Sequence, residues 1–334
     1  MFNKFYEKSK QIMKENYKFF IAIIAIVLLF TVELPYVVYS PGGSIDLSDR
    51  VSVTDGFESE GSLSMAYVSM IKGNIPFLLL SFVIPNWDIV STKDLKPSNE
   101  TLDEMIKSDQ IALKQAQNNA LYAAFTLAGK KVETLSQTNY IVYLSKEAQT
   151  DLQLFDEVES IDQVKIESLD MVKEIVSKKN VGDEVTIEIV RNGEKLNKKA
   201  KVYETTDGPK IGVSISSIYE YKSDPSVEMT SKSSESGPSG GLMTALSIYN
   251  SLVKEDITKG KKIIGTGTIN QDGSVGAIGG VKYKLLGAVK KKADIFLVPK
   301  DNYDEAVKVK QEEDLNIRLI SVSTLKEAVE AISK

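Results

Sequence analysis

The segment from Gly237 to Ala293 constrains the fold of this chain more than any other part of it. It opens with the pentapeptide Gly-Pro-Ser-Gly-Gly at 237–241, after which apolar residues recur at the spacing of a helix with one buried face. Residues 263–269 (IIGTGTI) have the composition of a strand, a turn follows at 270–273, and a second helix is expected to begin near Val281. This order of elements predicts that the pentapeptide lies at the start of a helix.

The composition restricts the chemistry open to Ser239 in that pentapeptide. The chain contains neither histidine nor cysteine, which excludes a Ser-His-Asp arrangement, thiol nucleophiles and Cys/His metal sites. Lysine is the remaining conventional base for a serine, so the residues favour a Ser-Lys hydrolase. Free N–H groups at the helix start favour a developing oxyanion, and Gly240 and Gly241 leave room for a substrate backbone. The alternative for the pentapeptide is a plain turn with a helix cap.

Residues 209–334 resemble the proteolytic domain of Lon-type proteases. That family carries a Gly-Pro-Ser-Ala-Gly motif, a Thr-Gly strand and an Ile-Gly-Gly-x-Lys-x-Lys helix start, which correspond here to 237–241, 266–267 and 278–284. The resemblance implies that Ser239 is the nucleophile, that Lys284 is the general base and that the Thr266 hydroxyl positions the lysine.

Two lysines compete for the role of base. Lys282 and Lys284 lie on opposite flanks of the apolar face of the predicted helix, so helical spacing does not choose between them. The family pattern selects Lys284, whose pKa must then fall by roughly 2–4 units from about 10.4 through burial. Gly237 and Gly240 are the supporting glycines of the motif. Gly240 replaces the usual alanine, and Ser236 stands where full-length Lon has an acidic residue.

An apolar segment near the N-terminus sets the expected compartment. Five lysines precede it, residues 19–32 carry no charge, and no basic residue follows until position 50. The positive-inside rule then predicts a cytoplasmic tail at 1–18, a single transmembrane anchor at 19–39 and an extracellular remainder. The uncharged run is about 21 Å long as a helix, against a hydrocarbon core near 30 Å, so residues 33–39 must complete the crossing. A cleaved signal peptide is the alternative, although no small-x-small cleavage site follows.

The segment 40–127 carries no recognisable chemistry. β-Branched and aromatic residues alternate and mix within 45–95, which favours strands. Residues 101–127 have helical periodicity, and Thr101 and Glu104 are spaced as a capping box. The segment is interpreted as an extracellular spacer or a scaffold that precedes the protease domain.

Residues 128–205 carry a second pattern. A helix is expected at 168–176, followed by a Gly-Asp turn into an alternating strand that ends in an Asn-Gly hairpin at 192–193. Together with the preceding segment at 148–158, this pattern resembles a PDZ domain. The resemblance implies binding of extended peptides by strand addition, often through a C-terminus. The alternative is a structural α+β linker domain.

The order of anchor, PDZ-like domain and Lon-like domain resembles the PDZ-containing Lon-like membrane proteases of Gram-positive bacteria. The expected fold class is α+β multidomain, with an N-terminal transmembrane helix, a PDZ-like domain and a C-terminal Lon-type proteolytic α/β domain. The resemblance implies an ATP-independent, membrane-anchored, extracellular serine endopeptidase that cleaves peptides or unfolded segments and forms a homo-oligomer. Secreted peptide pheromones are one substrate class of the family.

Composition bears on cofactors and partners. The chain has no Gly-x-x-x-x-Gly-Lys-Ser/Thr loop and no pattern for a metal or an organic cofactor. Its net charge of −5 and the absence of a basic stripe argue against nucleic acid as a main partner. The expected partners are a peptide or protein substrate, a lipid bilayer and further copies of the chain.

Two other functions stay open at this point. One is a membrane-tethered peptide-binding module whose protease domain is inactive. The other is a different Ser-Lys class such as a signal peptidase, which the separation of about 200 residues between Ser239 and the apolar segment disfavours.

Overall fold

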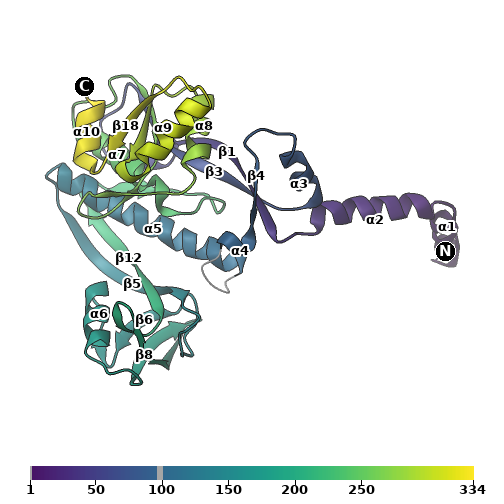
Figure 1. Cartoon of the computed structure of the whole chain (residues 1–334), viewed down its shortest axis with the longest axis horizontal. Coiled ribbons are helices and arrows are strands. Elements are labelled where there is room, and N and C mark those ends of the chain that lie inside the picture. Colours follow the sequence, from purple (N-terminus) through teal and green to yellow (C-terminus); the bar gives the residue numbers. More distant parts are fainter. Residues whose placement is uncertain (1, 96–100) are drawn as a thin grey trace. The chain divides into compact units, whose positions relative to one another are not determined.

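The computed structural model describes residues 2–95 and 101–334 and divides into two compact units (Figure 1). The first unit comprises the chain up to Pro41 together with Val68–Leu95, and the second comprises Gly42–Tyr67 together with the chain from Lys96 onward. Each unit is therefore assembled from stretches that are separate in the sequence.

The first unit consists of helices and a short antiparallel ladder. Its elements are α1 (Phe2–Glu15), α2 (Tyr17–Thr31), the first part of β1 (Tyr36–Asp46), the last part of β3 (Ser62–Lys72), α3 (Ile75–Ser81), β4 (Asp88–Ser91) and α4 (Thr92–Leu95). β1 pairs antiparallel with β4, with Tyr36 opposite Ser91 and Tyr39 opposite Asp88. The ladder fixes the chain directly after the N-terminal helices.

The expected transmembrane helix over 19–39 is wrong, because the helix stops before the apolar stretch ends. α2 ends at Thr31, and Val32 already has extended backbone angles (φ −74°, ψ 111°). Pro35 has no N–H with which to continue a helix, and β-branched Val37 is fully buried in β1. Within the described residues, no helix combines the length and the apolar character needed to cross a bilayer.

The second unit contains a mainly parallel sheet flanked by helices. From one edge, its strands are β18 (Arg318–Val322), β17 (Ile295–Pro299), β14 (Lys262–Gly265) and β3, with β1 beyond β3. β14 runs parallel to both β17 and β3, and β17 runs parallel to β18. Successive side chains point to opposite faces, so Ile263 and Leu297 enter one hydrophobic core while Ile264 and Phe296 enter another.

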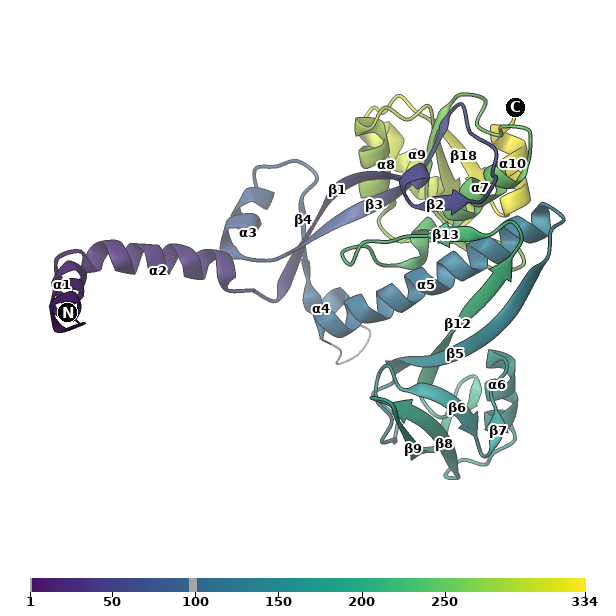
Figure 2. The same ribbon diagram turned by 180° about the vertical axis from the view of Figure 1, so that it is seen from behind.

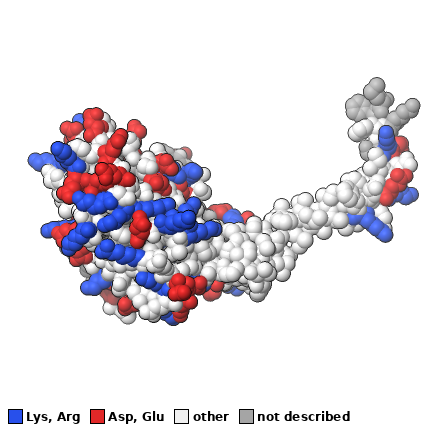
Figure 3. Space-filling model, turned by 90° about the horizontal axis from the view of Figure 1, so that it is seen from above, with Lys and Arg blue, Asp and Glu red and all other residues white. Residues whose placement is uncertain are grey.

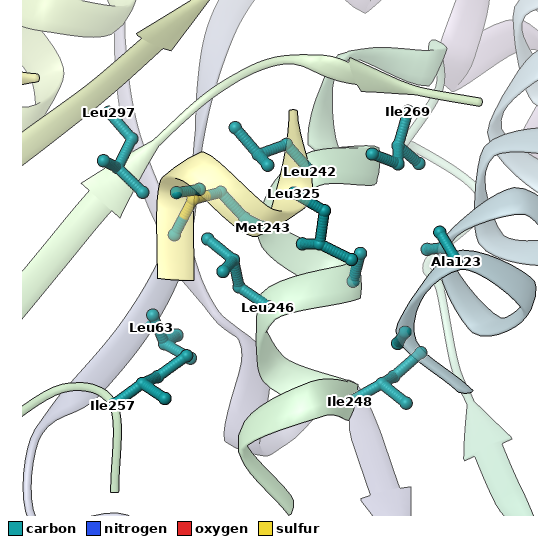
Figure 4. Close-up of a cluster of buried hydrophobic side chains, with 14 of the residues drawn as sticks. Leu63, Ala123, Leu242, Met243, Leu246, Ile248, Ile257, Ile269, Leu297 and Leu325 are labelled. Atoms are coloured by element: carbon teal, nitrogen blue, oxygen red, sulfur yellow. The ribbon is translucent and has the colours of Figure 1, made fainter. Parts of the chain in front are cut away.

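Five helices cover the two faces. The first core receives α5 (Leu102–Leu127), α7 (Gly241–Leu252) and α10 (Leu325–Ile332), and the second receives α8 (Val281–Lys290) and α9 (Tyr303–Glu312). In the first core, side chains from several elements converge on Leu242 and Leu246 of α7, both fully buried (Figure 4). α7, the helix that follows Ser239, is therefore deeply packed, with nine of its 12 residues buried.

Short elements complete this part of the second unit. They are η1 (Leu47–Asp49), β2 (Val51–Val53), β13 (Val227–Met229), η2 (Pro238–Gly240), β15 (Thr268–Ile269), β16 (Val275–Gly276) and η3 (Lys300–Asn302). β13 pairs with β2, and β15 pairs with β16 across the turn predicted at 270–273. The helix expected near Val281 begins at that residue.

α5 and β3 come from the segment 40–127. The predicted capping box is present: Thr101 N donates to Glu104 Oε2 (2.7 Å) and Glu104 N donates to Thr101 Oγ1 (3.2 Å). Ala120 and Phe125 of α5 are fully buried in the core that surrounds α7. The segment therefore supplies part of the core that carries Ser239.

The remaining part of the second unit is an antiparallel sheet with its own core. Its strand order is β12 (Val213–Ser223), β5 (Val132–Leu144), β6 (Glu157–Ile161), β8 (Glu184–Arg191) and β9 (Glu194–Lys201), and β7 (Val164–Lys165) pairs with β6. β5 and β12 run side by side as a long ribbon (Figure 2). A small hairpin of β10 (Tyr203–Thr205) and β11 (Gly208–Lys210) precedes β12.

Two local predictions for this sheet are confirmed. The helix expected at 168–176 is α6 (Leu169–Ser177), and Ser168 Oγ accepts a hydrogen bond from Met171 N (3.3 Å) at its start. β8 and β9 are joined through Asn192 (φ 53°) and Gly193 (φ 82°), the positive φ values that an Asn-Gly hairpin requires.

Candidate active site

Ser239 lies in a tight turn between a glycine with unusual backbone geometry and the buried helix α7. Gly237 has φ 87° and ψ 153°, a conformation that side-chain-bearing residues rarely adopt. Its N–H donates to the carbonyl oxygen of Asp109 in α5 (2.8 Å). Pro238 then opens the η2 turn that contains Ser239. The glycine predicted to support the site is thus required by the backbone path and is fastened to α5.

The space beside Gly240 explains why glycine stands where the Lon pattern has alanine. A Cβ atom added to Gly240 would lie 2.5 Å from Met65 Sδ, well inside van der Waals contact. Met65 comes from β3, which pairs with β14 in the sheet beneath the turn. A larger residue at 240 would therefore require Met65 to move.

Lys284 is buried and donates a hydrogen bond to a neutral hydroxyl. It belongs to the first turn of α8 and is 4% exposed. Its Nζ donates to Thr266 Oγ1 over 3.2 Å. Thr266 is fully buried, and its Oγ1 donates in turn to the carbonyl oxygen of Ser239 (3.0 Å). A chain of hydrogen bonds therefore joins Lys284 to the backbone of Ser239.

Thr266 occupies a break in the strand predicted at 263–269. β14 ends at Gly265 and β15 begins at Thr268, so the residues between them are not part of either ladder. Gly267 N donates to Ser239 O (2.8 Å), and Leu242 N donates to Gly267 O (3.0 Å). These hydrogen bonds connect the break to the turn that contains Ser239 and to the start of α7.

The burial of Lys284 has an electrostatic consequence. Desolvation disfavours the charged ammonium and lowers its pKa from 10.5 to about 8. A carboxylate partner would oppose this shift, whereas the Thr266 hydroxyl carries no charge. A substantial fraction of Lys284 is thus neutral near physiological pH and can accept a proton.

The structure distinguishes the two lysines that the helical wheel left open. Lys282 is partly exposed, and its Nζ lies 5.6 Å from the centre of the Tyr283 ring. Lys284 is the one directed to Thr266. The side chain brought into the network that contains Ser239 is therefore that of Lys284.

Asn302 is a supporting residue that sequence reasoning did not identify. Its Oδ1 accepts a hydrogen bond from Ile278 N (2.8 Å), and its Nδ2 donates to Ile278 O (3.0 Å). Ile278 directly precedes Gly279 and Gly280, and Gly280 has a left-handed conformation (φ 72°) at the start of α8. Asn302 thus fixes the entry into the helix that carries Lys284. No local pattern in the sequence marks this role.

Comparison with known proteins identifies the part of the chain that holds this network. Residues 229–333 match the model of the Lon protease (S16) C-terminal proteolytic domain. This part is Lon-like. The match includes the Ser239 turn, Thr266 and Lys284.

The curated relatives that the chain matches include Lon proteases. The Lon protease of Mesomycoplasma hyopneumoniae is 36% identical over 98 residues, and that of Clostridium beijerinckii is 38% identical over 95 residues. The first alignment covers 29% of this chain and the second 28%, and each spans only 11% of the relative's own length. The chain therefore spans only a small part of the length of the relatives that it matches.

A solved structure is similar to a part of the chain. The PDZ domain of an SdrC-like protein from Listeria monocytogenes is 21% identical, with 23% of this chain and 85% of that chain covered. The TM-score of 0.22 is too low to establish a common fold. The PDZ-like interpretation of 128–205 stays a prediction.

Proposed function

We propose that this protein is a serine endopeptidase in which Ser239 is the nucleophile and Lys284 the general base. The observation that carries the proposal is the buried Lys284 amine, held by Thr266, in a domain similar to the proteolytic domain of Lon. Burial gives the amine a pKa of about 8, which suits a base that works near neutral pH.

The proposed mechanism follows from this arrangement. Neutral Lys284 removes the proton of the Ser239 hydroxyl as Oγ bonds to the scissile carbonyl carbon. The tetrahedral intermediate collapses, the C–N bond breaks, and the ammonium of Lys284 gives its proton to the leaving amine. Water then repeats the sequence on the acyl-enzyme and releases the carboxylic acid. Pro238 has no N–H, so the oxyanion donors are the Ser239 N–H and a neighbouring segment.

Extended peptides are the substrate class that we propose, with secreted signalling peptides among them. A groove of about 720 Å³ lies between α6 and the β11–β12 region of the antiparallel part, and its apolar lining includes Val172, Val176, Ile211 and Val213. β12 is the terminal strand of its sheet, so its outer edge is suited to pairing with an added strand. This supports a PDZ-like role in holding substrate.

We further propose that the enzyme works without ATP, as a homo-oligomer attached to the outer face of a cell membrane. The lack of a nucleotide-binding loop supports the first point. The basic residues that precede and begin α2, together with the uncharged run from Phe19 to Thr31 in which no residue is buried, support attachment to a bilayer.

Labelling with a fluorophosphonate probe tests the catalytic assignment. The wild-type chain should be labelled and should cleave an unstructured fluorogenic peptide without added nucleotide. Ser239→Ala should lose both properties while keeping its circular dichroism spectrum. Equal labelling of wild type and Ser239→Ala would refute the nucleophile, and a folded wild type without labelling or cleavage would favour a peptide-binding module.

A further inference from the structure

The first unit exposes a second apolar surface besides that of α2. It is formed by α3 and the two residues that follow Ser81, and its outward side chains are those of Leu79 (62% exposed), Leu80 (43%), Phe82 (80%) and Val83 (79%). No charged residue occurs from Gly73 to Trp87. An exposed apolar patch of this kind marks a site of interaction with a protein or a membrane. We call these four residues the α3 surface.

Hydrogen bonds connect the α3 surface to α2. Asn74 is 8% exposed; its Oδ1 accepts from Phe77 N (3.1 Å) and starts α3, while its Nδ2 donates to the carbonyl oxygen of Phe30 near the end of α2 (3.0 Å). Leu34 N donates to Gly73 O (2.7 Å). One buried amide thus serves both helices and keeps them together.

The apolar side chains of α2 point in all directions around the helix. Phe19 is 62% exposed, Ile21 59%, Ile24 57% and Val27 51%, and none of its residues is buried. A protein groove covers one face of a helix, whereas lipid surrounds it. Figure 3 shows most of this segment as an uncharged surface, with charged residues at the end where α1 and α2 meet.

Charged residues lie at both limits of the apolar region. On one side, Lys8, Lys10, Lys14 and Lys18 complement anionic lipid headgroups. On the other side, Glu33 and Lys72 form an exposed ion pair (3.2 Å) next to the ends of α2 and β3. Trp87 lies near Phe77, with ring centres 6.5 Å apart, and tryptophan is enriched where a bilayer meets water.

We propose that the α3 surface inserts into the lipid bilayer beside α2, so that the membrane holds the protein through two elements. The partner is the apolar part of a phospholipid leaflet, and Trp87 lies at its boundary with water. This inference rests on the membrane attachment proposed above and adds a contact made by residues 79–83, far from Ser239 in sequence.

Trp87 is the single tryptophan of the chain and reports on this contact directly. The full-length protein is reconstituted into vesicles of phosphatidylcholine and phosphatidylglycerol with brominated or plain acyl chains. Tryptophan emission should fall in the brominated vesicles, and aqueous acrylamide should quench it less than in the unfolded chain. Normal emission in brominated vesicles, with free access for acrylamide, would overturn the inference.

A matched pair of variants separates the α3 surface from general apolar exposure. Phe82→Glu should reduce quenching by brominated lipid, while Phe57→Glu, at a residue of the second unit that is 47% exposed, should not. Both variants should retain peptide cleavage, which checks their folding. Equal quenching in Phe82→Glu and wild type would contradict the proposal. It would also be contradicted if brominated lipid did not quench the wild type and the wild type instead self-associated in plain vesicles, with Phe82→Glu abolishing that self-association.

Flotation of the vesicles on a density gradient distinguishes membrane attachment of the whole chain from insertion of the α3 surface. A chain that floats but keeps Trp87 in water refutes only the insertion of α3. A chain that does not float refutes the membrane attachment and the α3 contact together. Cleavage of a soluble peptide is independent of both results.

Discussion

Lysines in the two parts of the second unit have opposite environments. In the antiparallel part, Lys195 Nζ donates to both oxygens of Glu159 (2.9 and 2.8 Å) and Lys199 Nζ donates to Glu184 (2.8 Å). These lysines are exposed, and their carboxylate partners raise their pKa values. In the Lon-like part, Lys284 is buried against a hydroxyl and its pKa falls to about 8. The surroundings, and not the residue type, decide whether a lysine is a solvated cation or a base.

The largest expected effect is the loss of the buried lysine. Lys284→Ala should reduce kcat/KM by at least about 10⁴-fold, because it removes the base on which the Ser239 hydroxyl depends. Lys284→Arg should be equally inactive, since a guanidinium does not release its proton near neutral pH. Lys282→Ala, two residues away on α8, is the control and should stay near wild type in a peptide-cleavage assay. The reverse pattern would assign the base to Lys282.

The pH dependence of cleavage should report the lowered pKa of Lys284. A base must be neutral, so kcat/KM should rise tenfold per pH unit below about 8 and then level off. Between pH 6 and pH 9 the increase should be roughly 90-fold. If the base were an exposed, paired lysine such as Lys199, whose pKa is raised, kcat/KM would keep rising tenfold per pH unit up to the usual lysine range without levelling off near pH 8. A plateau already reached at pH 6 would exclude a lysine with a pKa of about 8 as the base.

Thr266→Val tests whether the hydroxyl positions the amine. Valine keeps the volume of threonine but cannot accept the hydrogen bond from Lys284 Nζ. We expect a decrease of about 10–50-fold in kcat with little change in KM, because the lysine is misplaced but present. Thr266→Ser should restore most of the rate. If Thr266→Ser is as slow as Thr266→Val, the methyl group and its packing matter, and not the hydrogen bond.

The smallest effect concerns stability. Lys284 has a lower pKa in the folded chain than in the unfolded chain, so between pH 8 and 10.5 the unfolded state binds more protons and stability rises with pH. Below pH 8 the buried lysine is charged and lowers the free energy of unfolding by its full desolvation cost, about 3 kcal/mol. Lys284→Met should therefore unfold at higher urea than wild type at pH 7, with a smaller difference near pH 10.

The exposed lysines provide the contrast to this stability test. Lys199→Met breaks a surface ion pair, and surface ion pairs contribute little to stability. Its urea midpoint should barely change, in either direction. A Lys284→Met protein that is less stable than wild type at pH 7 would mean that the amine contributes packing or hydrogen bonding that outweighs its desolvation.

Local patterns predicted local structure well. Ser168 at the start of α6, the Asn192-Gly193 hairpin and the Thr101–Glu104 capping box all lie where the sequence placed them, because each depends on residues a few positions apart. The candidate catalytic residues came from short motifs and a family resemblance. The spacing of the motifs does not show which side chains are buried, so the lowered pKa of Lys284 could be inferred only from the structure.

Long-range contacts were beyond the sequence. Met65 against Gly240, and Asn302 against Ile278, join residues that share no periodicity or motif. The extent of the N-terminal helix was misjudged for a related reason. Apolar composition alone suggested continuity to position 39, whereas the chain turns after Thr31 and gains ladder pairing with β4. Hydropathy indicates whether a segment prefers an apolar environment, but it does not show whether that segment is a helix or pairs with a strand.

The order of elements around α7 determines where this chain can be divided into fragments that fold. The match to Lon begins at residue 229, but the strand beside β14 and the long helix beside α7 come from β3 and α5, more than a hundred residues earlier. The antiparallel part is therefore an insertion between elements of the Lon-like part, and does not simply precede it. A fragment cut at the recognised boundary would expose Leu246 and Ile263 to water and should not fold autonomously. The region of sequence similarity to Lon begins at residue 229, whereas the unit that folds cooperatively also includes β3 and α5.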